Sequence, residues 1–239
     1  MPPRSTRRHR PWSAADDGGT SPLPSQPHPR NNRMNEKVMA VLDAYHERMR
    51  EEDQRRRETP PMGGSENWRD QVLLAVGPDT GQLLNILSRS LKAPNILEIG
   101  TSYGYSGIWL AEAAQATGGR LTTLELQDYK TAYARDMATK AGLADAIDFK
   151  VGDALQLIAE LPFKLDLVLL DLWKNLYEPC LEAFYPKLNP GAIIVADNML
   201  WPGGEEVKRY GRAVRAKPGM TSVLLPVGSG LEISRFEPT

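Results

Sequence analysis

Between residues 95 and 196 the chain alternates short apolar runs with amphipathic stretches, and this pattern restricts the possible folds more than any other feature. The apolar runs lie at residues 95–99, 121–126, 147–151, 165–170 and 192–196 and have the length and composition of buried strands. Turns that contain glycine or proline separate them from stretches with helical periodicity. Strands that alternate with helices form a parallel sheet covered on both faces. We therefore predict a doubly wound α/β fold.

Helices are expected before this region and a hairpin after it. From Met34 to about residue 57 the apolar side chains recur at steps of three and four, which predicts an amphipathic helix. A second helix is expected at about residues 79–91. Near the end of the chain, residues 221–227 and 231–236 flank a Gly-Ser-Gly turn, which predicts an antiparallel hairpin that closes the sheet.

The first 33 residues differ in composition from the rest of the chain. They contain seven prolines, six arginines and two acids, so we expect a disordered basic tail over residues 1–33 and one domain over residues 34–239. The tail carries 6 − 2 = +4 charges, which leaves −1 − 4 = −5 for the domain. The tail could be a contact arm, a targeting peptide or a dispensable extension.

Composition excludes several kinds of chemistry for the domain. The only histidines are His9, His28 and His46, so beyond residue 46 there is no imidazole for a catalytic triad or a histidine-rich zinc site. The single cysteine, Cys180, permits no intramolecular disulfide and is typical of a reducing compartment, so we expect a cytoplasmic protein. The net charge of −1 and the lack of a long apolar run argue against nucleic acid and membrane as partners.

Glycines and acids stand where the first two predicted strands end, and doubly wound sheets bind ligands at this edge. After the first strand, Gly100 and Gly104 allow a tight turn and the close approach of a ligand to the backbone. Their spacing differs from the Gly-x-Gly-x-x-Gly pattern of dinucleotide binders. Glu125 ends the second strand and could accept hydrogen bonds from both ribose hydroxyls, or it could be a solvated acid.

Three further polar residues follow the fourth and fifth strands, which a doubly wound order would make neighbours. These residues are Asp171, Asp197 and Asn198. Two carboxylates and an amide oxygen form a hard ligand set that suits Mg²⁺ better than zinc. The structural alternative is that Asp171 caps the next helix and Asp197-Asn198 forms a turn.

Taken together, these segments resemble the class I S-adenosylmethionine-dependent O-methyltransferases of the catechol and caffeoyl-CoA type. The most specific element is Glu98-Ile-Gly-x-x-x-Gly-Tyr-Ser106, followed by Asp171-x-x-Lys174 and Ala196-Asp-Asn198. The resemblance covers about residues 76–236. It implies a Rossmann-like, mostly parallel sheet of seven strands with a C-terminal antiparallel hairpin and added N-terminal helices. The implied cofactors are S-adenosyl-L-methionine and Mg²⁺.

The resemblance also implies roles for individual residues. Cofactor binding would involve Val76, Gly77, Glu98, Gly100, Thr101, Ser106, Glu125, Leu126, Asp153, Ala154 and Asp171. The metal would be held by Asp171, Asp197 and Asn198, and Lys174 would be the general base. The substrate would contact Trp173, Lys174, Asn198 and Pro202.

These roles predict a Mg²⁺-dependent O-methyltransferase of a small catechol-like or hydroxycinnamate-like aromatic, with a homodimer as a compatible assembly. Vertebrate catechol enzymes have a glutamate before the final hairpin, whereas residues 221–227 contain no acid, so we expect a different substrate pocket. One alternative is methylation of hydroxylated tRNA uridines, supported by the basic tail and by Lys208, Arg209, Arg212 and Arg215. The other alternative, an NAD-dependent dehydrogenase, is disfavoured by the glycine spacing.

Overall fold

The computed structural model describes residues 34–58 and 71–238, and the predicted tail at residues 1–33 lies outside this range. The helices are α1 (Glu36–Glu58), α3 (Pro78–Arg89), α4 (Tyr105–Thr117), α5 (Asp128–Ala141), α6 (Ala154–Glu160), α7 (Tyr177–Phe184) and α8 (Glu205–Ala216). The strands are β1 (Asn95–Ile99), β2 (Arg120–Glu125), β3 (Ile147–Val151), β4 (Leu165–Leu170), β5 (Leu188–Ala196), β6 (Met220–Leu225) and β7 (Leu231–Phe236). Among the described residues, no helix is both long and apolar enough to cross a membrane.

The strands form one seven-stranded sheet in the order β3-β2-β1-β4-β5-β7-β6. The first five strands pair in parallel, and β7 pairs antiparallel with both β5 and β6. The order in which the strands are added reverses between β1 and β4, which is the switch point of a doubly wound sheet. The predicted fold, including the C-terminal hairpin, is confirmed.

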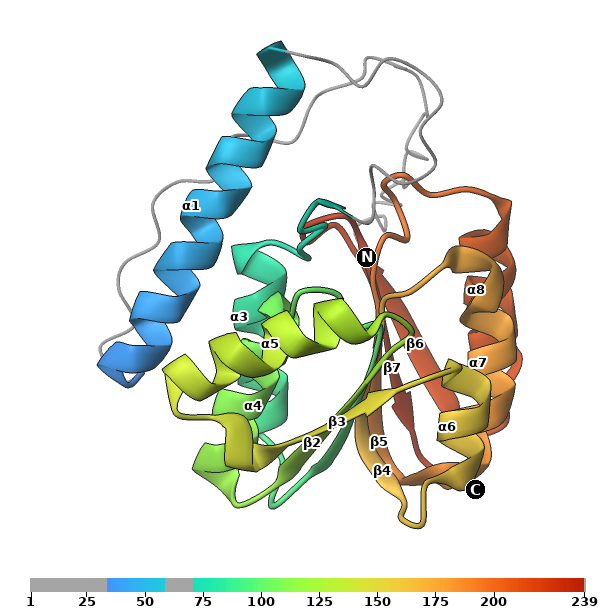
Figure 1. The fold of residues 1–239 in the computed structure, drawn as a ribbon. Coiled ribbons are helices and arrows are strands. Elements are labelled where there is room, and N and C mark those ends of the chain that lie inside the picture. Colours follow the sequence, from blue (N-terminus) through green and yellow to red (C-terminus); the bar gives the residue numbers. More distant parts are fainter. Residues whose placement is uncertain (1–33, 59–70, 239) are drawn as a thin grey trace, which may run out of the picture. The chain divides into compact units, whose positions relative to one another are not determined.

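Helices cover both faces of the sheet, with α1, α3, α4 and α5 on one face and α6, α7 and α8 on the other (Figure 1). Neighbouring side chains on one strand enter different cores because they point to opposite faces. On β1, for example, Ile96 packs with the first group of helices and Leu97 with the second. Burying an aliphatic side chain of this size contributes about 1.5–3 kcal/mol, so the two cores hold the sheet between the helical layers.

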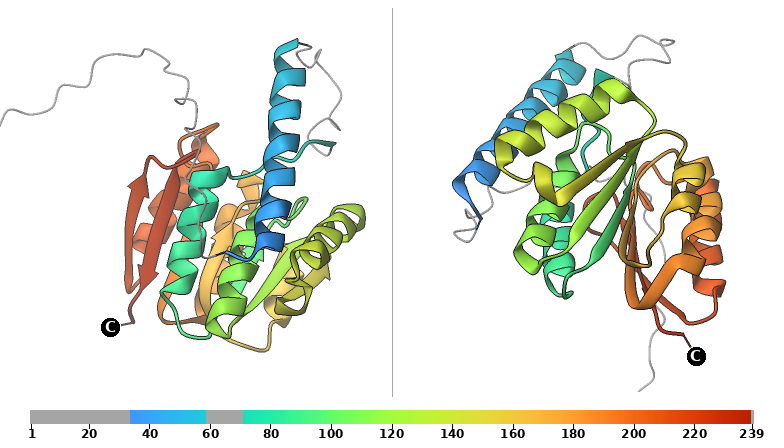
Figure 2. Two further views of the ribbon diagram at one scale, coloured as in Figure 1. Left: turned by 90° about the vertical axis from the view of Figure 1, so that its left-hand side faces the viewer. Right: turned by 60° about the horizontal axis from the view of Figure 1, so that its bottom comes forward.

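Helix α1 lies beside α5 and also packs on α4 (Figure 2). Its predicted apolar stripe is buried in the first half of the helix, where Val38, Val41, Leu42 and Tyr45 are at most 5% exposed. Near the end of α1, Glu51, residues 53–55 and residues 57–58 are exposed, whereas Glu52 is buried. The spacing of the apolar residues thus explains how the first half of α1 packs, but it does not explain why Glu52 is buried.

The start of β5 differs from the prediction. We predicted a strand at residues 192–196 after a turn, which would contain Pro190 and Gly191, but the strand already begins at Leu188. The pairing with β4 shifts register in this stretch, from Leu165 opposite Leu188 to Leu167 opposite Ile193. Proline has no N–H to donate to a ladder and is therefore tolerated in a strand at such an irregularity.

Candidate active site

The carboxyl ends of four adjacent strands form one continuous edge. Beyond the ladders, the N–H groups of Gly100 and Thr101 each donate to the Leu124 carbonyl at 3.0 Å. The N–H of Asp171 donates to the Ile99 carbonyl at 3.0 Å, and the N–H of Asp197 donates to the Leu170 carbonyl at 3.1 Å. The segments that follow β1, β2, β4 and β5 are therefore brought together, as the parallel order predicted.

Gly100 is required at this edge by the neighbouring strand. Its φ is +106°, and a Cβ there would lie 2.1 Å from the carbonyl oxygen of Asp171. We expected a glycine that lets a ligand approach the backbone. The structure shows that the backbone after β4 already occupies the space next to Gly100, so any larger residue would separate β1 from β4.

Glu125 is held rigidly by backbone N–H groups. Its Oε2 accepts from Ser102 at 2.8 Å, and its Oε1 accepts from Leu126 and Gln127 at 3.0 Å each. The side chain is half-buried. A carboxylate fixed in this way keeps lone pairs for further donors, so its orientation is set before any ligand binds.

Glu98 lies beneath this edge in a buried polar network. Ser106 and Thr123 donate their hydroxyls to the two carboxyl oxygens at 2.6 Å each, and Thr101 is hydrogen-bonded to Thr123. Burial raises the pKa of Glu98 to about 7, although both hydroxyl bonds lower it. The side chains of Glu98, Thr101 and Ser106 thus support the edge from inside.

Replacing Glu98 by glutamine should make folding stability less sensitive to pH. Because the folded-state pKa of about 7 exceeds the unfolded value of 4.5, ionised Glu98 destabilises the fold as pH rises from about 4.5 through 7. The expected gain for Glu98→Gln at pH 8 is about 3 kcal/mol in the free energy of unfolding, and near zero at pH 4. Denaturant titrations at both pH values check this. The exposed Glu160→Gln is the control, and an equal change at both pH values in Glu98→Gln would contradict the burial argument.

Asp197 is the most unusual acid of the site. It is 1% exposed, and its Oδ1 has no hydrogen-bond partner among the described residues. Burial raises the pKa of Asp197 above its ordinary value, and the nearby Asp171 adds to this rise. A buried carboxylate oxygen without a donor is unfavourable unless a cation compensates it.

The predicted metal ligands fit a hard divalent cation. Asp171 and Asp197 supply carboxylates from adjacent strand ends, and Asn198, the second residue after β5, is held in the left-handed region at φ +58°. In the described parts of the chain no three His, Cys, Asp or Glu residues gather to hold a metal. The amide oxygen of Asn198 is therefore needed to complete an all-oxygen set, which suits Mg²⁺.

Lys174 lies next to both acids. Its Nζ is 3.1 Å from Asp171 Oδ1 and donates to the Tyr177 hydroxyl at 2.7 Å. That hydroxyl donates to the carbonyl of Asp197 at 3.1 Å, and burial raises the pKa of Tyr177 well above its usual value. Tyr177 therefore stays neutral and links the lysine to the fifth strand. We did not predict this role, although the position of Tyr177, three residues after Lys174, was a usable signal.

The other predicted site residues lie on segments next to this edge, and their structural roles differ. Asp153 accepts from Gln156 N at 3.0 Å and caps α6, which begins at Ala154. Val76 is buried, and Gly77 precedes α3. Exposed apolar side chains that lie on the segments next to the edge are Leu126 at 65%, Trp173 at 57%, Leu200 at 51% and Trp201 at 72%. Of these, Leu200 and Trp201 were not predicted.

The basic cluster on α8 is largely neutralised by acids. Lys208 pairs with Glu205 at 3.0 Å, Arg209 pairs with Glu178 at 3.1 Å, and Arg215 pairs with the buried Glu232 at 2.6 Å. These pairs reduce the positive charge that the cluster offers to phosphates. The predicted alternative of a tRNA substrate therefore gains no support from this surface.

The sheet order, the terminal hairpin and the acids at the strand ends define a Rossmann-like methyltransferase fold. Residues 68–235 match the family model described as O-methyltransferase, and the chain belongs to this family. The predicted resemblance to the catechol and caffeoyl-CoA enzymes is confirmed by relatives that bear those names.

Two relatives and one solved structure illustrate the similarity. A catechol O-methyltransferase of Niastella koreensis is 35% identical over 136 residues, which cover 54% of this chain and 60% of that protein. Caffeoyl-CoA O-methyltransferase 1 of Eucalyptus globulus is 26% identical over an alignment of 234 residues, and the match covers 86% of this chain and 94% of that protein. The O-methyltransferase TomG of Streptomyces achromogenes, solved with S-adenosylmethionine, shares the fold with a TM-score of 0.64 at 24% identity, covering 86% of this chain and 91% of that chain.

Proposed function

We propose that the chain is a Mg²⁺-dependent O-methyltransferase that moves a methyl group from S-adenosylmethionine to a hydroxyl of a small catechol-like or hydroxycinnamate-like aromatic. The observation that carries this proposal is the buried Asp197 Oδ1, which has no partner among the described residues, beside Asp171. The family membership and the names of the relatives support the transferred group and the acceptor class.

Glu125 and the two loops around it are the proposed cofactor site. Ser102 and Gln127, from the segments that follow β1 and β2, both donate their backbone N–H groups to this carboxylate. Its free lone pairs would accept the ribose hydroxyls, and the exposed Leu126 beside it would border the adenine. The site thus presents a fixed charged acceptor next to an apolar surface.

Lys174 is the proposed proton acceptor. An unperturbed phenol has a pKa of about 10, so an acceptor hydroxyl must lose its proton to become a good nucleophile at neutral pH. When bound, Mg²⁺ supplies positive charge that favours the ionised hydroxyl, and S-adenosylmethionine supplies a methyl group on a sulfonium centre. Tyr177 orients Lys174 Nζ through its hydroxyl, and Asp197 in turn fixes Tyr177.

An apolar surface beside these groups is the proposed aromatic subsite. Trp173 directly precedes Lys174, and two residues separate Asn198 from Trp201-Pro202. Both indoles are more than half exposed. The N–H groups of Leu200 and Trp201 donate to the Ser229 carbonyl at 3.0 and 2.9 Å, which fixes their loop on the final hairpin. Flat apolar side chains near a polar cluster suit a phenolic ring.

A methyl-transfer screen tests the proposal. The purified chain would be incubated with labelled S-adenosylmethionine and, separately, with catechol, caffeate, caffeoyl-CoA or bulk tRNA, each with and without MgCl₂. We expect label in the aromatic acceptors only when Mg²⁺ is present. Label confined to tRNA would show that the acceptor is RNA and not a small aromatic. Equal transfer without a divalent cation would show that the reaction does not need the metal.

Replacing Glu125 by alanine should weaken the binding of S-adenosylhomocysteine by about 1–3 kcal/mol, the cost of losing a charged acceptor. The reason is that Glu125 is already held in place by three N–H groups and can offer its free lone pairs to hydroxyls. Calorimetric titration measures the dissociation constant directly. The control is Glu160→Ala on the exposed end of α6. An unchanged dissociation constant in Glu125→Ala would exclude this residue from the cofactor site.

A further inference from the structure

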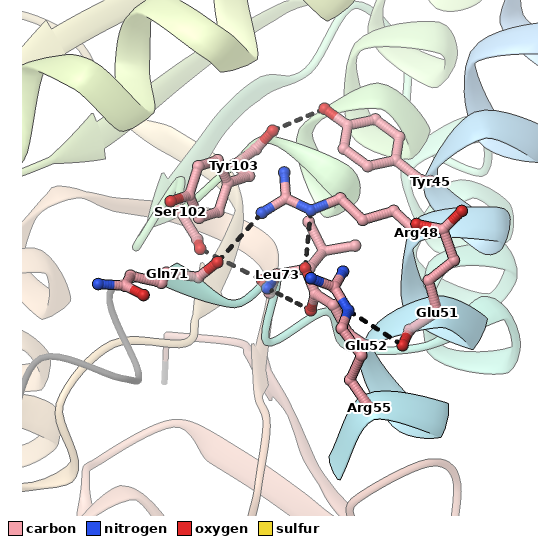
Figure 3. Close-up of polar contacts among 9 residues, drawn as sticks. All are labelled: Tyr45, Arg48, Glu51, Glu52, Arg55, Gln71, Leu73, Ser102 and Tyr103. Carbon is pink, nitrogen blue, oxygen red and sulfur yellow. Dashed lines mark hydrogen bonds and ion pairs between the residues drawn. The ribbon is translucent and has the colours of Figure 1, made fainter. Parts of the chain in front are cut away.

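The second half of helix α1 carries an ion pair that contacts the segment before α3. Arg48 Nε donates to Glu52 Oε1 at 2.8 Å, and Glu52 Oε2 accepts from the backbone N–H of Leu73 at 2.9 Å (Figure 3). Glu52 is only 6% exposed. Arg48 also donates to the Gln71 carbonyl at 3.5 Å, so α1 contacts this segment at two points.

The same pair reaches the loop that follows β1. The Arg48 guanidinium lies 4.3 Å from the centre of the Tyr103 ring, and Tyr45 donates its hydroxyl to the Tyr103 carbonyl at 2.6 Å. Ser102 Oγ donates to the Leu73 carbonyl at 3.4 Å. Figure 3 shows these side chains converging between α1, the segment after Gln71 and the loop of Ser102 and Tyr103. The loop and the segment are thus joined to each other and to α1.

Two backbone conformations in this network are unfavourable by themselves. Leu74 has a φ of +45° and Ser102 a φ of +48°, and neither residue is a glycine. Such conformations persist only where surrounding contacts hold them. Ser102 is held by Glu125 through its N–H, and the residue before Leu74 is held by Glu52. Half-buried Glu125 therefore acts on strained Ser102 directly, and buried Glu52 acts on Leu73, the neighbour of strained Leu74. The hydrogen bond from Ser102 Oγ to the Leu73 carbonyl joins the two segments.

We propose that Glu52, supported by Arg48, is a positioning residue for cofactor binding. Glu52 fixes Leu73 and thereby orders residues 73–77 and the loop of Ser102. In this arrangement Glu125 can bind the nucleoside part of the cofactor, and Gly77 can border its methionine part. This inference rests on the proposed function. Without Glu52 the strained segment relaxes, and part of the binding free energy is then needed to reorder it.

The prediction is that Glu52→Ala raises the dissociation constant of S-adenosylhomocysteine about tenfold, the effect of losing a hydrogen bond to a charged acceptor. Two α1 variants are matched controls. Glu51→Ala removes the same charge from the adjacent exposed position, and Val41→Ala weakens the packing of α1 away from Leu73. Both should keep the wild-type dissociation constant within about twofold, even where Val41→Ala lowers the melting temperature.

Two further readouts separate positioning from general stability. Hydrogen exchange of peptides that cover residues 71–77 and 100–104 should become faster in Glu52→Ala and should slow again with saturating S-adenosylhomocysteine. In methyl transfer, the KM for S-adenosylmethionine should rise with the dissociation constant, whereas kcat should stay within about twofold because the acceptor site is not altered. If Glu52→Ala does not fold, Glu52→Gln retains one acceptor oxygen and should show a smaller rise in the same direction.

Each outcome distinguishes this inference from the proposed function. Tight binding of S-adenosylhomocysteine by both wild type and Glu52→Ala would overturn the positioning role and leave the proposed function intact. Equal weakening by Val41→Ala would reduce Glu52 to a general stabiliser of α1 and would also overturn the inference. Failure of the wild-type chain to bind S-adenosylhomocysteine would overturn the proposed function and this inference with it.

Discussion

Replacing Asp197 by alanine should lower methyl transfer by about 10³-fold or more, because the several kcal/mol that a bound cation supplies to the transition state would be lost. EDTA should abolish transfer in the wild type, and added Mg²⁺ should restore it, whereas added Mg²⁺ should not restore Asp197→Ala. Zinc should substitute poorly because Asp171, Asp197 and Asn198 offer only oxygen ligands. Initial rates with catechol at several Mg²⁺ concentrations measure the effect.

The fold should tolerate this substitution. The Asp197 carboxylate is desolvated and its Oδ1 has no partner among the described residues, so its removal should not lower the melting temperature. Binding of S-adenosylhomocysteine should also persist, since the proposed metal positions the acceptor. The control is the exposed Asp145→Asn. Full activity of EDTA-treated wild type would show that Asp171, Asp197 and Asn198 are structural residues of turns and caps.

Replacing Lys174 by alanine should slow turnover by about 10²–10⁴-fold, the usual contribution of a general base. Nζ lies 3.1 Å from Asp171 Oδ1, next to the predicted metal ligands, so it can reach a hydroxyl bound there. Raising the pH should rescue the variant by about tenfold per pH unit below the phenol pKa of about 10, because solvent then supplies the phenolate. Single-turnover rates between pH 7 and pH 9 measure this dependence.

Lys174→Arg separates proton transfer from simple charge. Arginine keeps the positive charge beside Asp171 but does not lose a proton in proteins, so this variant should be as slow as Lys174→Ala. The exposed Lys140→Ala on α5 should keep the wild-type rate. If Lys174→Arg retains most of the activity, Lys174 acts only through its ion pair with Asp171.

The architecture and the positions of the acids could be predicted from local sequence patterns. Alternating strands and helices predicted the parallel sheet, because periodicity and turn residues are properties of short segments. In a parallel sheet the carboxyl ends of neighbouring strands meet at one edge. The order of the strands therefore brings Glu125, Asp171 and Asp197 to that edge once each is known to end a strand.

The contacts that each of these side chains makes could not be predicted and follow from the packing of the folded chain. The Gly100 position is filled by the Asp171 carbonyl, Tyr177 links Lys174 to Asp197, and Asp197 is buried with one oxygen that has no partner among the described residues. Glu52, a charged residue outside the apolar stripe of its helix, is nevertheless buried and accepts from the N–H of Leu73. Such contacts join residues far apart in the chain, and they depend on strand register and helix packing, which no local pattern specifies.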